Sequence, residues 1–134
     1  MIRLLIAVGF IASTCLTQAQ TNIPLVPMGA VWKYLDRGGD QGTAWIAPAF
    51  NDSTWPSGPA QLGYGDGDEA TTVGFGPNPT SKYTTTYFRH RFVVNDASAV
   101  TNLGMRLLVD DGAVVYLNGA EVLRANLPAG VINF

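Results

Sequence analysis

Apolar and polar residues alternate most clearly in the stretch that runs from Leu103 to Arg124. Every second residue from Leu103 to Val109 is apolar, which is the pattern of a strand with one face on a core. An Asp-Asp-Gly bend interrupts the pattern, and Val114 to Leu117 resumes it. Asn118-Gly119 follows, a dipeptide that favours a type I′ hairpin. Glu121 to Arg124 is therefore predicted to be the returning strand.

Further short strands are predicted upstream, at Val31 to Leu35, Ala60 to Tyr64 and Tyr83 to Asn95. The last is the longest candidate, because it is rich in Thr, Tyr, Phe and Val. A single helical turn is expected between Trp45 and Trp55, where an Asn-Asp-Ser run supplies capping chemistry. Many short strands separated by Gly, Pro and Asn predict an all-β fold, an antiparallel β-sandwich or jelly roll.

The N-terminal residues predict where the protein acts. Residues 1–19 have the pattern of a secretory signal peptide, with Arg3, an apolar run from Leu4 to Ala12 and small residues towards Ala19. The run is shorter than the roughly 20 residues that a membrane-spanning helix needs. We therefore expect a secreted, periplasmic or cell-surface protein whose mature chain has no membrane span.

Residues 20–30 are expected to form an extended lead-in, and residues 31–134 a single β-sandwich domain. The sequence stops at Phe134 with a predicted sheet edge unpaired, an arrangement that natural folds avoid. The domain is therefore expected to be truncated at its C-terminus, and the sequence to be a fragment of a longer polypeptide.

Composition excludes several classes of function. The only cysteine, Cys15, lies in the predicted signal peptide, so disulfides, Cys-ligated zinc and a cysteine nucleophile are excluded from the mature chain. A net charge of -2 argues against nucleic acid, whose binding proteins present basic patches. The only histidine, His90, lies inside a predicted strand and there is no Gly-x-Ser-x-Gly motif, so a catalytic triad has little to start from. No catalytic residue is assigned, although a carboxylate pair distant in sequence stays formally open.

Three segments together resemble a known family. They are Trp45 to Trp55 with its Asn-Asp-Ser turn, Tyr87-Phe88-Arg89 followed by Phe92, and Val114 to Gly119. In this order they resemble the galactose-binding-like jelly roll, and especially the sugar-binding domain of family 2 glycoside hydrolases. In those enzymes the domain is an accessory to a catalytic barrel. The resemblance therefore implies a non-catalytic module with further domains in the same polypeptide.

A shorter element has a resemblance of its own. Leu108 to Gly112, followed by Tyr116 to Gly119, is similar to the Asp-Asp-Gly element of protective-antigen-type lectin domains. There, two consecutive aspartates coordinate calcium, which in turn holds sugar hydroxyls. The resemblance implies calcium as the candidate cofactor and Asp110 and Asp111 as its ligands.

Two acidic clusters are candidate metal sites, because calcium takes six to eight oxygen ligands from carboxylates on Gly-rich loops. The first is Asp110 with Asp111, and the second is Asp66, Asp68 and Glu69. The alternative for the first pair is that it shapes a turn, which Asp-Gly does routinely. The alternative for the second cluster is a solvated acidic loop. If the two clusters meet in space, they would build one site from both.

Aromatic and amide side chains are the candidates for ligand contact. Tyr64 and Tyr83 flank the long loop that follows the Ala60 to Tyr64 strand, and Asn118 lies in the predicted hairpin. Trp45 and Trp55 are interpreted as core or loop anchors. Arg89 and Arg91 share one strand face and are expected to pair with an acidic residue across strands.

These observations predict a non-catalytic secreted module that recognises a carbohydrate or a cell-surface polymer. The alternative is a structural spacer domain of a secreted glycoside or phosphoester hydrolase whose catalytic part is absent from this sequence.

Overall fold

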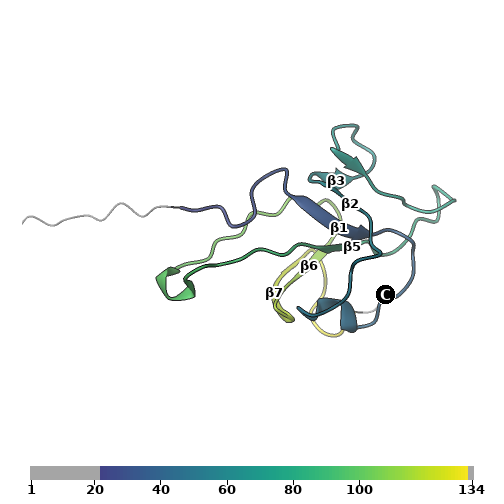
Figure 1. The fold of residues 1–134 in the computed structure, drawn as a ribbon. Helices are drawn as coiled ribbons and strands as arrows, with labels where there is room; N and C mark the ends of the chain where they lie inside the picture. Colours follow the sequence, from purple (N-terminus) through teal and green to yellow (C-terminus); the bar gives the residue numbers. More distant parts are fainter. Residues whose placement is uncertain (1–21, 133–134) are drawn as a thin grey trace, which may run out of the picture.

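The strand β1 (Val31–Leu35) is the centre of the largest sheet in the computed structural model, which describes residues 22–132. It pairs antiparallel with β2 (Ser57–Pro59) on one side and with β5 (Tyr87–Arg89) on the other (Figure 1). β1 has the predicted bounds, as expected from its β-branched and aromatic residues. The predicted signal peptide lies outside the described residues.

A buried glycine sets how closely the next layer approaches this sheet. Trp32 of β1 lies opposite Gly58 of β2, and a Cβ atom at Gly58 would overlap the side chain of Thr71. The Thr71 hydroxyl instead donates to the carbonyl oxygen of Pro59 at 2.8 Å. The missing side chain at Gly58 therefore lets Thr71 pack directly on β2.

The short strands β3 (Leu62–Gly63) and β4 (Thr71–Thr72) pair in parallel. This pairing corrects the expectation that all strands are antiparallel, and β3 retains only two of the five residues predicted from Ala60 to Tyr64. Gly65 and Gly67 both have positive φ angles, which glycine adopts without steric cost. The connecting loop can therefore bring the chain back alongside β3 in the same direction.

The hairpin of β6 (Ala113–Leu117) and β7 (Ala120–Ala125) confirms the strongest local prediction. Asn118 and Gly119 connect the strands with φ angles of 52° and 86°, as a type I′ turn requires. The predicted returning arm lies within β7.

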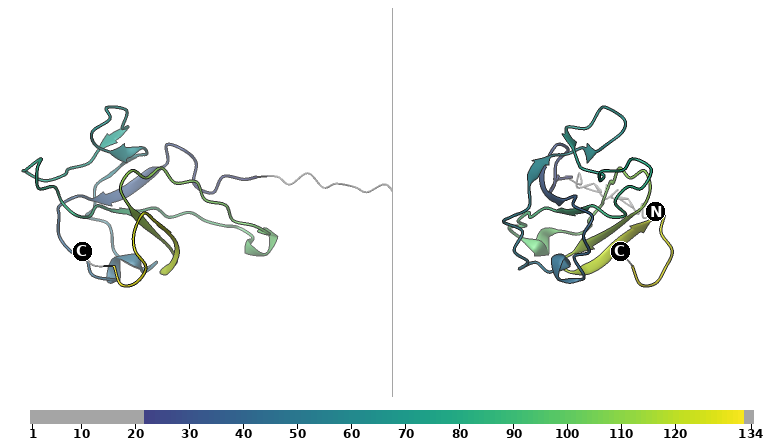
Figure 2. Two further views of the ribbon diagram at one scale, coloured as in Figure 1. Left: turned by 180° about the vertical axis from the view of Figure 1, so that it is seen from behind. Right: turned by 90° about the vertical axis from the view of Figure 1, so that its right-hand side faces the viewer.

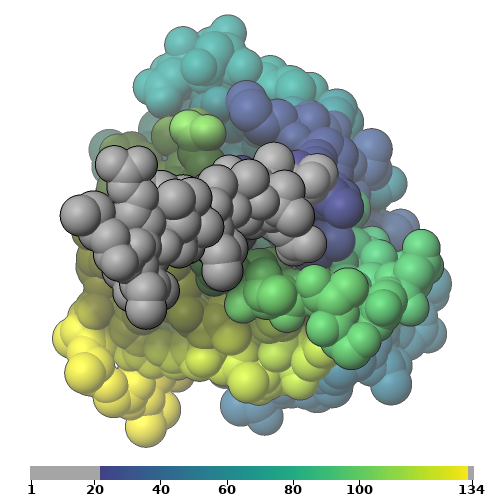
Figure 3. Space-filling model, turned by 90° about the vertical axis from the view of Figure 1, so that its left-hand side faces the viewer, coloured from purple at the N-terminus to yellow at the C-terminus, as the bar shows by residue number. Residues whose placement is uncertain are grey.

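Two longer strand predictions are wrong. Leu103 to Val109 forms no strand, and of Tyr83 to Asn95 only the three residues of β5 pair. The residues between β5 and β6 form a loop that extends away from the sheet, with the short 3-10 turn η2 (Ala97–Ala99) at its tip (Figures 1 and 2). The loop, coloured green in the space-filling view, lies at the surface (Figure 3). Alternation gives Leu103 to Val109 one apolar face that a sheet could bury. Within residues 22–132, however, no neighbouring strand lies beside this segment to pair with it.

The core is an aromatic cluster beneath the largest sheet. The buried apolar side chains of the described part of the chain are Trp55, Val73 and Tyr87. Trp45 packs its edge against Tyr87, with ring centroids 5.1 Å apart, and Phe50 packs similarly against Trp55 at 5.7 Å. The interpretation of both tryptophans as anchors is therefore confirmed.

The predicted helical turn is displaced along the chain. The 3-10 turn η1 (Ala44–Ile46) contains Trp45 itself instead of following it. The Asn51 side chain accepts a hydrogen bond from the Ser53 N–H at 3.1 Å, which is an Asx turn and not a helix cap.

The described residues confirm an all-β character, with short strands and two single 3-10 turns. The sheets are small and do not close on one another. Within residues 22–132, no helix is long and apolar enough to cross a membrane.

Candidate functional site

An acidic pocket of about 300 Å³ lies between β3 with its following loop and the segment that precedes β6. We define the acidic pocket by its lining residues Gln61, Tyr64, Asp66, Glu69, Leu108 and Asp110. Members of both predicted acidic clusters therefore line the same pocket, although they are far apart in the sequence. Tyr64, a predicted ligand contact, lies with them.

Glu69 closes the loop on one side of the acidic pocket. Its carboxylate oxygens accept hydrogen bonds from the backbone N–H groups of Asp66 and Gly67, each at 3.0 Å. The hydrogen bond from Asp66, together with those from the backbone of Glu69 itself and Gly67, outweighs desolvation and holds the pKa of Glu69 below its ordinary value. The carboxylate is therefore ionised at neutral pH while it shapes the loop.

The remaining predicted metal ligands lie outside the acidic pocket. Asp68 accepts a hydrogen bond from the Gln61 amide at 3.4 Å, and Asp111 is exposed in the bend before β6. Within residues 22–132, no three His, Cys, Asp or Glu side chains converge closely enough to hold a metal ion. The oxygen chemistry suits calcium, but these positions do not yet form a coordination sphere.

The predicted ligand contacts occupy three different environments. Tyr64 is half-buried in the acidic pocket, with its ring 5.0 Å from that of Phe75 and the Lys82 ammonium 4.6 Å from its centroid. Tyr83 lies outside the acidic pocket and packs against Gly76. Asn118 is exposed in the hairpin turn, also outside the pocket. Tyr64 alone of the three therefore joins the acidic residues.

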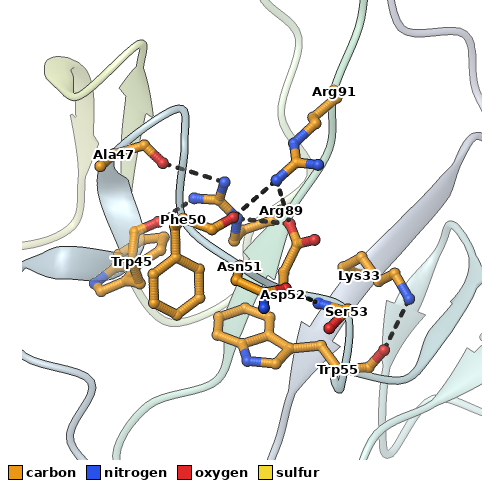
Figure 4. A network of polar contacts seen from close by, with 10 residues as sticks. All are labelled: Lys33, Trp45, Ala47, Phe50, Asn51, Asp52, Ser53, Trp55, Arg89 and Arg91. Carbon is orange, nitrogen blue, oxygen red and sulfur yellow. Dashed lines mark hydrogen bonds and ion pairs between the residues drawn. The ribbon is translucent and has the colours of Figure 1, made fainter.

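A second polar centre was missed by sequence reasoning, except that Arg89 and Arg91 were expected to have an acidic partner. The partner is Asp52, which lies in the loop before β2 and not on a neighbouring strand. The Arg89 Nε atom donates to Asp52 Oδ2 at 2.9 Å, and Arg91 Nη2 lies 3.4 Å from the same oxygen. Asp52 therefore lies between two guanidinium groups (Figure 4). The only sequence signal was the absence of a carboxylate on the strands nearby.

Arg89 also ties the aromatic core together through backbone carbonyls. Its two Nη atoms donate to the carbonyl oxygens of Trp45 and Ala47, and Arg91 donates to that of Phe50 at 2.8 Å. The segment with η1 belongs to no sheet, and of these carbonyl oxygens that of Ala47 also accepts from the Phe50 N–H at 3.1 Å. The two arginines therefore fasten this segment to β5.

Asp52 is the one charged residue of the described chain that is buried as a whole, at 7% exposure. Burial alone would raise its pKa, but the hydrogen bond from Arg89 and the charges of Arg91 and Arg89 together lower it. Asp52 is therefore ionised in the folded protein, and the pair is a buried ion pair.

A basic pocket of about 290 Å³ lies beside this ion pair, at the edge shared by β1 and the end of β5. We define the basic pocket by Trp32, Lys33, Asp52, Arg89, His90 and Arg91. The His90 ring lies against Trp32, with centroids 5.0 Å apart, and its Nδ1 atom bonds the carbonyl oxygen of Val31 at 2.9 Å. The basic pocket shares no lining residue with the acidic pocket.

Comparison of the chain with protein-family models, with curated proteins and with solved structures finds no match. The family resemblance described above therefore remains a hypothesis that the residues alone support.

Proposed function

We propose that the chain is a non-catalytic module, of the galactose-binding-like jelly-roll type, that recognises a carbohydrate or a cell-surface polymer. One observation supports this most directly: the acidic pocket gathers Tyr64 with the carboxylates of Asp66, Glu69 and Asp110. These are the residue types that the proposed activity needs, and they come from two distant segments.

The acidic pocket offers groups that complement both kinds of surface on a sugar ring, the hydroxyl groups and the C–H faces. Sugar hydroxyls donate to planar acceptors such as the carboxylates of Asp66 and Asp110, and the Gln61 amide adds donors. Leu108 and the ring of Tyr64 supply apolar wall for the C–H faces of the sugar.

Calcium is the cation we propose for this site. It prefers carboxylate and carbonyl oxygens and tolerates irregular geometry, and Asp66 and Asp110 bring carboxylates to the acidic pocket from two distant segments of the chain. Binding would draw the Gly65 to Glu69 loop towards the bend at Asp110. Apart from the adjacent residues, no atom of residues 22–132 lies within 4 Å of the position that a Cβ atom would take at Gly65 or Gly67, so this part of the loop has open space around it.

The experiment measures thermal unfolding with and without calcium, and retardation of the protein on gels that contain immobilised neutral polysaccharides. We expect calcium to raise the melting temperature and at least one polysaccharide to retard the protein. Both effects should disappear in the double variant Asp110→Asn/Asp111→Asn. Asp96→Asn is the matched control, because it removes a carboxylate from η2 but keeps the oxygen that bonds Ser98. An unchanged melting temperature together with unretarded migration would reject the proposal.

The second candidate function is a structural spacer within a secreted hydrolase. One observation favours it: both oxygens of Glu69 already accept backbone hydrogen bonds, so this carboxylate has a structural use without any ligand. A spacer predicts neither the calcium effect nor the retardation.

A further inference from the structure

The basic pocket is positively charged in a chain whose net charge is -2. Its lining holds the cations Lys33, Arg89 and Arg91 against the single carboxylate of Asp52. Its volume of about 290 Å³ is close to the lower end of the range, about 300 to 1,000 Å³, of small-molecule sites. An anion of modest size is the ligand that this charge and volume favour.

Hydrogen-bond donors remain available on two of the three cations. Each nitrogen of Arg89 already donates to Asp52 or to a backbone carbonyl. Arg91 is different, because its side chain is 62% exposed and only its Nη2 atom has a partner within residues 22–132. Lys33 donates one bond, to the carbonyl oxygen of Trp55 at 3.0 Å. The remaining donors of Arg91 and Lys33 can form charge-assisted hydrogen bonds with a carboxylate.

An aromatic wall stands beside these donors. Trp32 is half-buried and packs against the His90 ring at a tilt of 40°. The bond from Nδ1 to Val31 fixes the orientation of that ring and leaves Nε2 as its other hydrogen-bonding atom. An indole face accepts the C–H face of a pyranose ring, so the ligand should join an anionic group to such a ring.

Asp52 discriminates between kinds of anion. Its ionised carboxylate lines the same pocket and repels a dianion, such as a phosphate ester, more than it repels a monoanion. A carboxylate carries a single charge and matches the planar guanidinium of Arg91.

We infer that the basic pocket binds the carboxylate of a uronic acid, with the sugar ring against Trp32 and the carboxylate on Arg91 and Lys33. This inference rests on the proposed function for its ligand class, a sugar, but not for its site. The protein would thus hold an acidic sugar in one pocket and a neutral or calcium-bridged sugar in the other.

The test is titration of the protein with galacturonate, followed by calorimetry and by the intrinsic tryptophan fluorescence, to which Trp32 contributes together with Trp45 and Trp55. Galacturonate should bind and galactose should not, and Arg91→Gln should weaken galacturonate binding by about tenfold or more. Arg106→Gln is the matched control, since it removes one arginine from the exposed loop. Arg91→Lys keeps the charge and should retain part of the affinity. Equal affinity for galactose and galacturonate, or equal losses in the two Gln variants, would overturn the inference.

Two further measurements distinguish binding in the basic pocket from general charge attraction and from binding in the acidic pocket. Polygalacturonate should bind in the same way as the monosaccharide. If Arg106→Gln abolished the binding of polygalacturonate as fully as Arg91→Gln, the binding would be general attraction between a polyanion and positive charge, and the inference would be overturned. Asp110→Asn/Asp111→Asn should leave galacturonate affinity unchanged. The Asp110→Asn/Asp111→Asn variant should therefore lose the calcium effect and still bind galacturonate. Arg91→Gln should keep the calcium effect and lose galacturonate binding.

Discussion

At the scale of single residues, the fold depends most on the buried ion pair of Asp52 and Arg89. Both side chains are 10% exposed, in a protein whose other buried side chains are few and mostly aromatic. A buried charge is tolerated only when it is paired and hydrogen-bonded. Arg89 meets that condition for Asp52 and at the same time donates to the carbonyl oxygens of Trp45 and Ala47.

Replacing Asp52 with Asn should strongly destabilise the protein. The variant leaves Arg89 buried without a counter-charge, a change that costs about 3 to 5 kcal/mol. Urea denaturation followed by tryptophan fluorescence measures the free energy of unfolding. Asp40→Asn serves as the control, because its side-chain oxygen can still accept from Gly42, and it should change stability by less than about 0.5 kcal/mol. Similar losses in both variants would contradict the role of the ion pair.

The same carboxylate predicts a dependence of stability on pH. The pKa of Asp52 is lower in the folded protein than its ordinary value, so the folded state binds this proton less readily than the unfolded state. Its stabilising contribution is therefore present at neutral pH and is lost as the pH falls through the folded pKa, below about pH 4. The free energy of unfolding, measured across this pH range, should fall less steeply with decreasing pH for Asp52→Asn than for the wild type. Parallel curves would show that other carboxyl groups cause the acid sensitivity.

At the scale of elements, the β6–β7 hairpin is the most locally determined part of the fold. Its turn has two consecutive residues at positive φ, and the Arg124 side chain joins Glu121 at 2.7 Å and the carbonyl oxygens of Pro128 and Gly130. β7 and the segment that follows it are thus connected within one short stretch of chain.

Gly119→Ala should weaken this hairpin. A Cβ atom there would meet nothing closer than the Ile46 carbonyl at 3.8 Å, so the cost arises from the positive φ angle and amounts to about 1 to 2 kcal/mol. Thermal unfolding should show a lowered melting temperature. Gly104→Ala is the control, because it has open space around it and no positive φ, and it should have little effect. A Gly119→Ala protein as stable as the wild type would exclude the type I′ turn.

At the scale of the whole molecule, the described surface holds an unusual amount of exposed apolar side chain. Leu103, Met105, Leu107 and Leu108 of the loop between β5 and β6 are 54%, 46%, 45% and 77% exposed. An extended segment with apolar side chains and unpaired backbone groups is a template for association.

Leu103→Lys/Leu107→Lys should therefore reduce self-association without lowering the melting temperature. Light scattering across a range of concentrations, together with binding of a hydrophobic dye, gives the measurement. The exposed Thr101 provides the control, since Thr101→Lys adds charge on the same loop without removing apolar surface. If Thr101→Lys reduced association as much as the double variant, general charge repulsion would explain the result.

The candidate sites illustrate how far sequence reasoning extends. Tyr64, Asp66, Glu69 and Asp110 were all identified from the sequence as candidates, but nothing local indicated that they line one pocket. Asp52 was identified only as part of a turn, although it proves to be the partner of Arg89 at a separation of 37 residues.

The sequence by itself determined the elements whose cause lies within a few residues. β1 follows from its β-branched and aromatic residues, and the β6–β7 hairpin follows from Asn118-Gly119, because backbone preference at these positions needs no distant partner. The tertiary structure alone decided the parallel pairing of β3 with β4, the exposure of Leu103 to Leu108 and the burial of Asp52. Each of these depends on which distant segment lies alongside, and alternation or charge in one segment does not specify its neighbour.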